Sequence, residues 1–198
     1  MRKIFSLIIL FLFLHACSAT INTVRQFGAG VEISFDPRSV GMQIDDSIMK
    51  KSLQLKMAIV PGKNYPIYIM IEVIDGAIFI TGKVDEPEEK IKITKLAWET
   101  KGVRSVKNAI SIKGQSNFKS TAKDVLITSH LRVRLISNKK IKSGNYTLET
   151  INKNIYIFGI ALDAEEKKEV MNEANNIYDV ASVIPSIYLV SELSRNKN

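Results

Sequence analysis

The sequence predicts an α+β protein built from two tandem αββαβ modules, each with two helices packed on a three-stranded sheet. Three observations carry this prediction. First, 13 of the 41 positions from 72 to 112 hold the same residue as the position 77 further on, which indicates an internal duplication. Second, residues 72–84 and 149–161 each contain two apolar runs separated by turn residues, as β-hairpins do. Third, apolar residues at helical spacing precede and follow each hairpin.

The first helix of module one has an apolar face formed by Met49, Leu53 and Met57 at i, i+4 and i+8. Asp45 or Asp46 is expected to cap this helix. In the second helix, Pro87 suits the first turn, and the face of Ile93, Ala97 and Thr100 is expected to point inward. The expected elements are a helix near 45–58, strands at 67–74 and 77–84, a helix at 87–101 and a strand at 105–112.

Module two repeats this order with similar faces. Its first helix presents Ile127, Leu131 and Leu135 inward, and its second helix presents Val170, Ala174 and Ile177. Pro185 cannot donate a backbone hydrogen bond, so the last strand is expected at an edge of its sheet or bulged there. The expected elements are a helix near 121–136, strands at 146–151 and 154–161 around a turn at 152–154, a helix at 164–177 and a strand at 183–190.

The first residues have the layout of a bacterial export signal. Met1-Arg2-Lys3 is a basic start, residues 4–14 are apolar, and Ala16 is a small residue before the expected cut. This apolar run is shorter than the roughly 20 residues that a helix needs to cross the hydrocarbon core. We therefore expect residues 1–16 to be removed. An uncleaved membrane anchor is the alternative.

Cys17 is the only cysteine in the chain, so no intrachain disulfide can form. The sequence Leu14-His15-Ala16-Cys17 resembles the lipobox of bacterial lipoproteins, a family in which this cysteine is acylated and becomes the new N-terminus. That resemblance implies a lipid anchor on Cys17, and Ser18 after it implies sorting to the outer membrane, facing the periplasm. Several acyl chains give stable anchoring, since each buried methylene contributes about 0.8 kcal/mol.

The chain is basic, with a formal net charge of +8 that falls to +6 when Arg2 and Lys3 are removed with the signal. A positive charge favours anionic partners such as phospholipid headgroups, nucleic acid or acidic proteins. Nucleic acid is not expected as a partner of an exported chain. An anionic phospholipid surface is therefore the first partner to consider.

A second resemblance covers almost the whole chain. Residues 36–46 read DPRSVGMQIDD, and this string stands between the lipobox and the two modules. In that position it resembles the dual-BON-domain outer-membrane lipoproteins, whose BON domains have the αββαβ order. The ending Gly102-Val103-x-x-Val106-x-Asn108-x-Ile110 is also similar to theirs. Module two departs from this ending at Asp179 and Pro185.

The resemblance implies a division of the chain and a role. It implies binding of phospholipid by the first helix of the second module, support of envelope integrity, enrichment at the division site and association with the outer-membrane protein assembly machinery. The implied segments are a signal peptide (1–16), an acylated N-terminus and tether (17–43), BON domain 1 (44–113), a linker (114–119), BON domain 2 (120–193) and a tail (194–198).

Helix 121–136 carries the candidate lipid-binding residues. Its face away from the inward residues combines apolar tips with cations, namely Lys123, Leu126, His130, Val133 and Arg134. Such a face suits an anionic membrane surface, where each Lys or Arg contributes about 1 kcal/mol. The resemblance places the family's key aromatic position at Leu126. The alternative is an ordinary solvated helix face.

Two further apolar sets are candidate interfaces. Ile91 and Trp98 lie seven residues apart on one helix face, where they could touch lipid, a partner protein or, as we expect, the other module. Phe79, Tyr156 and Phe158 point away from the inward isoleucines of their strands and are expected to meet between the modules.

An enzyme is not expected, and neither is a cofactor or a metal. His15 lies in the signal, and His130 has no acidic or cysteine neighbour on its helix. The repeated pairs Glu88-Glu89 and Glu165-Glu166 fall at helix N-termini, where carboxylates stabilise the helix dipole. Phosphate-loop, Gly-x-Ser-x-Gly and zinc spacings are missing from the sequence. The alternative to a lipid-binding lipoprotein is a periplasmic protein–protein adaptor.

Overall fold

The computed structural model describes residues 36–61, 65, 69–114 and 118–194, which belong to one compact unit. The export signal, the lipobox and Cys17 lie outside the described residues. Among the described helices, none is long and apolar enough to cross a membrane.

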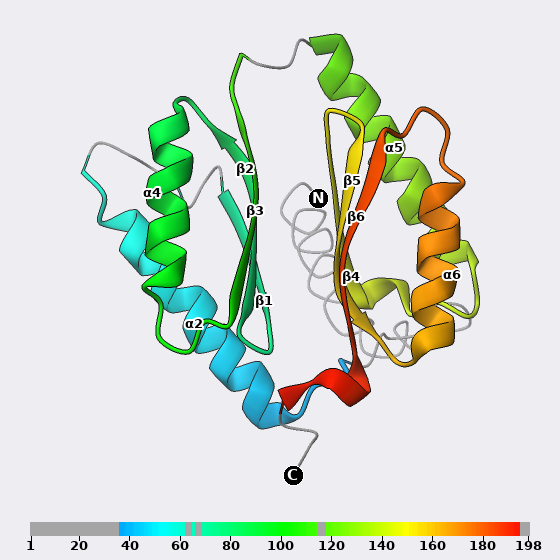
Figure 1. Cartoon of the computed structure of the whole chain (residues 1–198), viewed down its shortest axis with the longest axis horizontal. Helices are drawn as coiled ribbons and strands as arrows, with labels where there is room; N and C mark the ends of the chain where they lie inside the picture. The colour runs from blue at the N-terminus through cyan, green and yellow to red at the C-terminus, as the bar shows by residue number, and fades with distance from the viewer. Residues whose placement is uncertain (1–35, 62–64, 66–68, 115–117, 195–198) are drawn as a thin grey trace, which may run out of the picture. The chain divides into compact units, whose positions relative to one another are not determined.

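The αββαβ order is confirmed in both modules (Figure 1). Within each module the two helices lie on one face of the sheet. Module one contains α2 (Val40–Ala58), β1 (Ile69–Ile74), β2 (Ala77–Val84), α4 (Pro87–Trp98) and β3 (Ser105–Ile112). Module two contains α5 (Phe118–Ser137), β4 (Tyr146–Ile151), β5 (Asn154–Ala161), α6 (Ala164–Asn175) and β6 (Ser182–Leu189).

Each sheet has its second strand in the centre. β1 pairs antiparallel with β2, and β3 pairs parallel with β2 after the crossover through α4. β4, β5 and β6 repeat this pattern. Pro185 lies on the edge strand β6 opposite Ile157, so its missing N–H leaves no gap in the interior of the sheet. The expected edge position of this proline is confirmed.

The first helix begins earlier than the sequence predicted. α2 starts at Val40, because Ser39 is its N-cap and the Ser39 hydroxyl accepts a hydrogen bond from Met42 N at 3.3 Å. The expectation that Asp45 or Asp46 caps the helix was therefore wrong. Asp46 lies in the helix and is buried against the sheet.

The Asp46 carboxylate holds the hairpin turn instead. Its oxygens accept hydrogen bonds from Asp75 N at 2.9 Å and Gly76 N at 3.1 Å. Both turn residues have positive φ, 48° and 75°, as a two-residue hairpin turn requires. Arg38 completes the arrangement by donating to Asp46 at 2.7 Å and to the Val73 carbonyl at 2.9 Å. These contacts give residues 36–46 a structural role.

Module two uses the same device. Asp124 of α5 accepts hydrogen bonds from Asn152 N and Lys153 N, each at 2.8 Å. Asn152 and Lys153 both have positive φ, while Asn154 already begins β5. The turn is thus two residues long, one shorter than predicted. Non-glycine residues rarely adopt this conformation, and the Asp124 contacts stabilise it here.

Three apolar clusters form the core. The inward helix positions predicted from spacing are buried, which confirms those faces. One cluster lies inside module one around Leu53, Ile80 and Ile93, and one inside module two around Leu131, Ile157 and Val170. The third joins the two sheets and includes Met42, Ile74, Ala77, Phe79, Ala109, Phe158, Ile160 and Leu193.

Candidate functional site

α5 is fixed on its sheet by both apolar and polar contacts. Ile127, Leu131 and Leu135 are buried in the module-two core. Asp124 holds the β4–β5 turn, and Thr128 Oγ1 donates to Thr150 Oγ1 on β4 at 2.7 Å. Since a helix advances by about 100° per residue, these contacts leave the face centred on residue 129 exposed.

This exposed face carries an apolar row, which we call the α5 stripe. Leu126 and Val133 were predicted on it, and they are 57% and 61% exposed. Val125 and Ile136 belong to the same row and were missed. Their spacing could have revealed them, because Val125 lies four residues before residue 129, the centre of the exposed face, and Ile136 lies four residues after residue 132 on that face. The stripe thus consists of Val125, Leu126, Val133 and Ile136.

The predicted cations lie on the flank of α5 that faces α6, not within the stripe. Lys123 Nζ is 3.0 Å from Asp179, and Arg134 Nε is 2.7 Å from Glu173. The Arg134 hydrogen bond lowers the pKa of Glu173 below its usual value. Hydrogen bonds from Lys153 and then Lys123 lower the pKa of Asp179. Because these cations already have partners, less of their charge is available to an outside anion.

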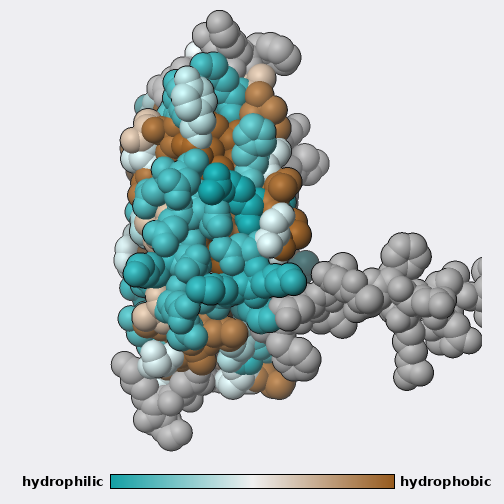
Figure 2. Space-filling view, turned by 90° about the vertical axis from the view of Figure 1, so that its right-hand side faces the viewer, coloured by the Kyte–Doolittle hydropathy of each residue, from teal (hydrophilic) through white to brown (hydrophobic). Residues whose placement is uncertain are grey.

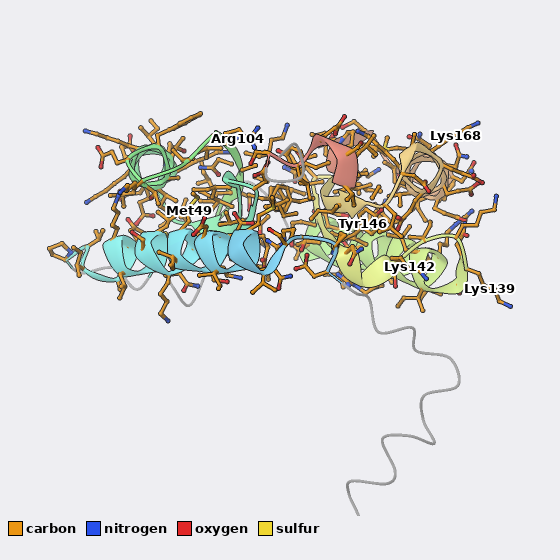
Figure 3. All side chains as sticks on the ribbon, turned by 90° about the horizontal axis from the view of Figure 1, so that it is seen from below. Met49, Arg104, Lys139, Lys142, Tyr146 and Lys168 are labelled. Atoms are coloured by element: carbon orange, nitrogen blue, oxygen red, sulfur yellow. The ribbon has the colours of Figure 1, made fainter. Side chains whose placement is uncertain are left out.

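Arg132 lies on the same face of α5 as the stripe. Arg132 and His130 are exposed, and within the described residues Arg132 has no carboxylate at ion-pair distance. Lys139 and Lys142 follow the end of α5, as Figure 3 shows. The face that Figure 2 shows is mostly hydrophilic, with separate hydrophobic patches. α5 thus presents an apolar row with basic residues near it.

The repeated glutamates are used inside the fold. Glu89 Oε2 accepts hydrogen bonds from Asp85 N at 2.8 Å and Glu86 N at 3.1 Å. Glu166 accepts from Leu162 N and Lys142 N, each at 2.7 Å. Both carboxylates are buried and hold the strand-to-helix turn, a role beyond the dipole effect expected from the sequence. Within the described ranges, no group of three His, Cys, Asp or Glu side chains could hold a metal ion.

The candidate interface residues divide into two groups. Phe79 and Phe158 stack at a centroid distance of 5.1 Å, and Tyr156 lies 6.5 Å from Phe79. These three rings, which were expected to meet between the modules, lie together in the cluster that joins the two sheets. Ile91 and Trp98, for which contact with the other module was expected, lie instead on the outer side of α4 and are 69% and 50% exposed.

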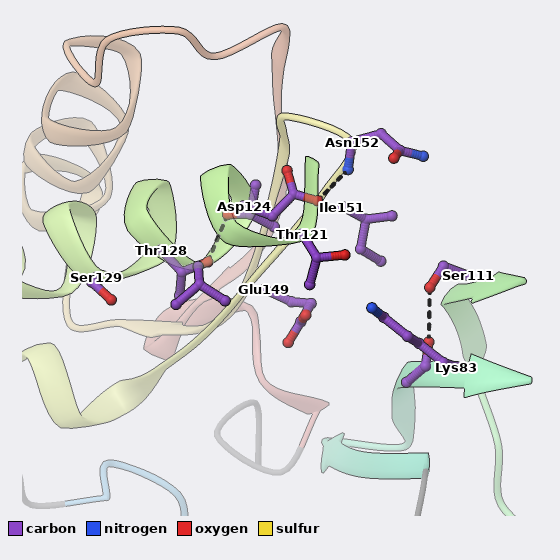
Figure 4. A pocket seen from close by; sticks show the side chains of 12 residues that line it. Lys83, Ser111, Thr121, Asp124, Thr128, Ser129, Glu149, Ile151 and Asn152 are labelled. Atoms are coloured by element: carbon purple, nitrogen blue, oxygen red, sulfur yellow. Dashed lines mark hydrogen bonds between the residues drawn. The ribbon is translucent and has the colours of Figure 1, made fainter. Parts of the chain in front are cut away.

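A cavity of about 330 Å³ lies between the modules and was not foreseen (Figure 4). Lys83 of β2 and Glu149 of β4 reach into it toward each other. Burial raises the pKa of Glu149, and the Lys83 charge opposes that rise. Neither makes an ion pair with another described residue, and the cavity is lined by no histidine or cysteine that could act as base or nucleophile. The cavity thus brings a lysine and a carboxyl of raised pKa into one space between the two modules.

Comparison with known proteins identifies the family. The BON domain model matches residues 46–114 and 123–189, which together are more than half of the chain. An uncharacterised protein encoded in the gshII 5′ region of Anaplasma centrale is 30% identical over 122 residues, covering 61% of this chain and 81% of that protein. The outer membrane lipoprotein DolP of Haemophilus influenzae is 23% identical over 180 residues, covering 89% of this chain and 86% of DolP.

Among solved structures, CdsD, a structural protein of the type III secretion system of Chlamydia trachomatis, aligns with a TM-score of 0.30 and 15% identity. The alignment covers 73% of this chain and 63% of that one, and a likeness this low carries no argument about function. The family rests on the matched residues, which coincide with the two αββαβ modules. The chain belongs to the BON-domain family and carries two BON domains in tandem.

Proposed function

We propose that this protein is a non-enzymatic outer-membrane lipoprotein that binds anionic phospholipid through α5 of its second BON domain. Acylated Cys17 would hold it in the outer membrane, facing the periplasm, where it supports envelope integrity, including at the division site. The observation that carries the proposal is the α5 stripe of exposed Val125, Leu126, Val133 and Ile136 beside basic residues.

The stripe has the properties of a helix that lies on a membrane surface. Its apolar tips can enter the boundary between headgroups and acyl chains, while the rest of α5 stays polar or buried. The side chains of the stripe are uncharged and their neighbour Arg132 is basic, so these residues do not repel anionic headgroups. The net charge of +6 expected for residues 17–198 favours the same partner.

Two of the basic side chains expected to bind lipid already form ion pairs on the flank of α5 that faces α6. Lys123 and Arg134 hold α5 against Asp179 and Glu173, so their first role is to orient the helix. Insertion of Leu126 and Val133 would then contribute more to binding than Coulomb attraction. For that reason the sharper test changes the apolar tips, because reversing Lys123 or Arg134 would also break contacts within the domain.

The relation to DolP supports the anchored location. The protein from Haemophilus influenzae is named an outer membrane lipoprotein, and the match covers 89% of this chain and 86% of DolP. The lipobox-like sequence that ends at Cys17 agrees with such an anchor. The family resemblance also suggests association with the outer-membrane protein assembly machinery.

The test is vesicle co-sedimentation of the unacylated mature chain, residues 17–198 with Cys17→Ala. We expect binding to vesicles of phosphatidylethanolamine with phosphatidylglycerol, and weaker binding without phosphatidylglycerol or at high salt. Leu126→Asp with Val133→Asp should lower the affinity about tenfold or more, because two apolar tips are lost and two like charges are brought to the anionic surface. Ile91→Asp on α4 is the matched control and should bind like the unchanged chain.

A periplasmic adaptor is the second candidate, favoured by the exposed pair Ile91 and Trp98 on α4. Exposed tryptophan is a common anchor in protein interfaces. If the unchanged chain does not bind vesicles, and Ile91→Asp rather than the α5 variant weakens the envelope in cells, the adaptor replaces the lipid proposal.

A further inference from the structure

The first helix of the first BON domain also exposes an apolar row, which we call the α2 stripe. It consists of Val40, Ile44, Ile48, Leu55 and Ile59. At 100° per residue these side chains fall within about a third of the helix circumference and run along its whole length. The opposite face is occupied by Met49, Leu53 and Met57 in the core, so the stripe has no partner among the described residues.

The charges around the α2 stripe are one-sided. Lys51 lies between Ile48 and Leu55 on the same face and is exposed. Of the two carboxylates in α2, Asp46 is buried at the hairpin turn, and Asp45 lies about a quarter turn from the centre of the stripe. An apolar row with a lysine and no carboxylate is the pattern of a helix that lies on an anionic membrane surface.

The duplication places the same pattern on α5. Asp46 and Asp124 have the same role at their hairpin turns, and they lie 78 residues apart. With this offset, Ile48 corresponds to Leu126 and Leu55 to Val133. The exposed fractions also correspond, at 63% and 59% in α2 against 57% and 61% in α5. Both copies thus leave the same two outward positions apolar.

The length of chain between α2 and Cys17 sets an upper limit on the distance between them. α2 begins four residues after Asp36, and Asp36 lies 19 positions after Cys17 in the chain. A chain of that length spans at most about 65 Å, which limits how far α2 can be from the leaflet that holds the lipid. A short tether of this kind gives an attached surface a high effective concentration at the membrane.

We infer that the α2 stripe is a second membrane-contact surface, which binds the headgroup layer of the leaflet that holds the anchor. The inference rests on the membrane location proposed above, but not on α5 as the lipid site. A protein with two contact surfaces and an acylated terminus would lie on the membrane through both BON domains. Each surface alone would bind weakly, and the two together more strongly.

The first experiment compares two matched pairs of substitutions in the unacylated chain, with vesicles of phosphatidylethanolamine and phosphatidylglycerol. Ile48→Asp with Leu55→Asp should lower the affinity about tenfold or more, as Leu126→Asp with Val133→Asp should. Loss with the α5 pair but not with the α2 pair overturns this inference and leaves the proposed function intact. Loss with the α2 pair alone supports the inference and removes α5 as the lipid site.

Two controls keep the result interpretable. If the aspartate pair lowers the melting temperature, Ile48→Ser with Leu55→Gln replaces it, because these changes remove the apolar tips without adding charge.

A fluorescent label tests the contact directly. The emission of a fluorophore on Ile44→Cys, in the chain whose only native cysteine is replaced, should shift to shorter wavelength on vesicles. The same label on Lys92→Cys of α4 should not shift. An unshifted label at position 44 overturns the inference.

A second copy of the chain is the competing occupant of the α2 stripe. Light scattering after gel filtration distinguishes a dimer from a monomer. A dimer that dissociates when Ile48 and Leu55 are replaced would show that the α2 stripe is covered by a second copy of the chain. That outcome also overturns the inference. A monomer that loses vesicle binding with the same substitutions supports it.

Discussion

The rings of Phe79 and Phe158 stack with centroids 5.1 Å apart and planes inclined by 17°, which joins β2 of the first BON domain to β5 of the second. Both side chains are almost fully buried, and Tyr188 packs edge-on against Phe158 at 6.1 Å. Domains of about 70 residues have small cores. We therefore expect the shared cluster to add to the stability of each domain and to couple their unfolding.

Truncating either ring should destabilise both domains. We expect Phe79→Ala and Phe158→Ala each to cost about 3–5 kcal/mol, and the double variant to cost less than the sum because the two rings share one contact. Hydrogen exchange at the core amides of β2 and β5 measures the effect in each domain. Ile93→Val, in the core of the first domain, is the control and should act mainly on β2. Unchanged exchange in β5 of Phe79→Ala would contradict the coupling.

The two aspartates at the hairpin turns should differ in cost. An asparagine can accept with only one of its side-chain atoms, so Asp124→Asn leaves one turn N–H without its acceptor, at about 1–3 kcal/mol. Asp46→Asn should cost more, because it also removes one of the two carboxylates that pair with Arg38, the other being Asp36. Urea unfolding of both variants tests the order. Asp85→Asn, which breaks an exposed ion pair with Lys113, should cost less than about 1 kcal/mol.

The carboxyl group of Glu149 should make the stability of the folded protein depend on pH. Burial raises the pKa of Glu149 above its usual 4.5, so the folded protein holds this proton more tightly than the unfolded chain. The contribution of the protonated Glu149 carboxyl to the free energy of unfolding is therefore complete below pH 4.5, and it falls as the pH rises through the raised pKa. Glu149→Gln should raise the Tm at neutral pH, and the gain should vanish in acid.

Lys83 provides the internal control for that prediction. Its charge opposes the rise in the pKa of Glu149, so Lys83→Met should make the loss of stability between acidic and neutral pH steeper. In the Glu149→Gln background the same substitution should leave the slope unchanged. A Tm gain from Glu149→Gln that is equal at acidic and neutral pH would show that Glu149 does not titrate as proposed.

The anchor can be tested by fractionation of cells. Cys17→Ala removes the only thiol that could be acylated, so we expect the protein to leave the outer-membrane fraction for the soluble periplasmic fraction. α2 and α5 would then hold it only weakly, and high salt should release any remainder. A variant that stays with the outer membrane after a salt wash would place the main attachment elsewhere in the chain.

Much of the fold could be predicted because its signals are local. The hairpin strands at 77–84, 146–151 and 154–161 were predicted with their observed bounds, since turn residues and alternation mark the ends of a hairpin strand. The start of α2 was missed because Ser39, Asp45 and Asp46 are all suitable caps. Asp46 is excluded as the cap because its carboxylate is engaged at the Asp75–Gly76 turn, a contact about 30 residues away in the chain.

The lipid-site residues show the same division. Spacing placed Leu126 and Val133 opposite the core, and both are exposed. Lys123 and Arg134 were placed on the same face, although they lie beside α6 and pair with Asp179 and Glu173. Which acidic groups face them depends on how α6 packs beside α5, and the sequence of α5 contains no information on that.

The sequence by itself determined the duplication, the αββαβ order and the inward face of each helix, because each of these depends on neighbours within a few residues. Only the tertiary structure decided what covers the outward faces. Phe79 and Phe158 are buried against each other, whereas Trp98 and Ile91 stay exposed on α4. Periodicity gives the direction of a side chain from its own helix or strand, but burial depends on which other element packs there.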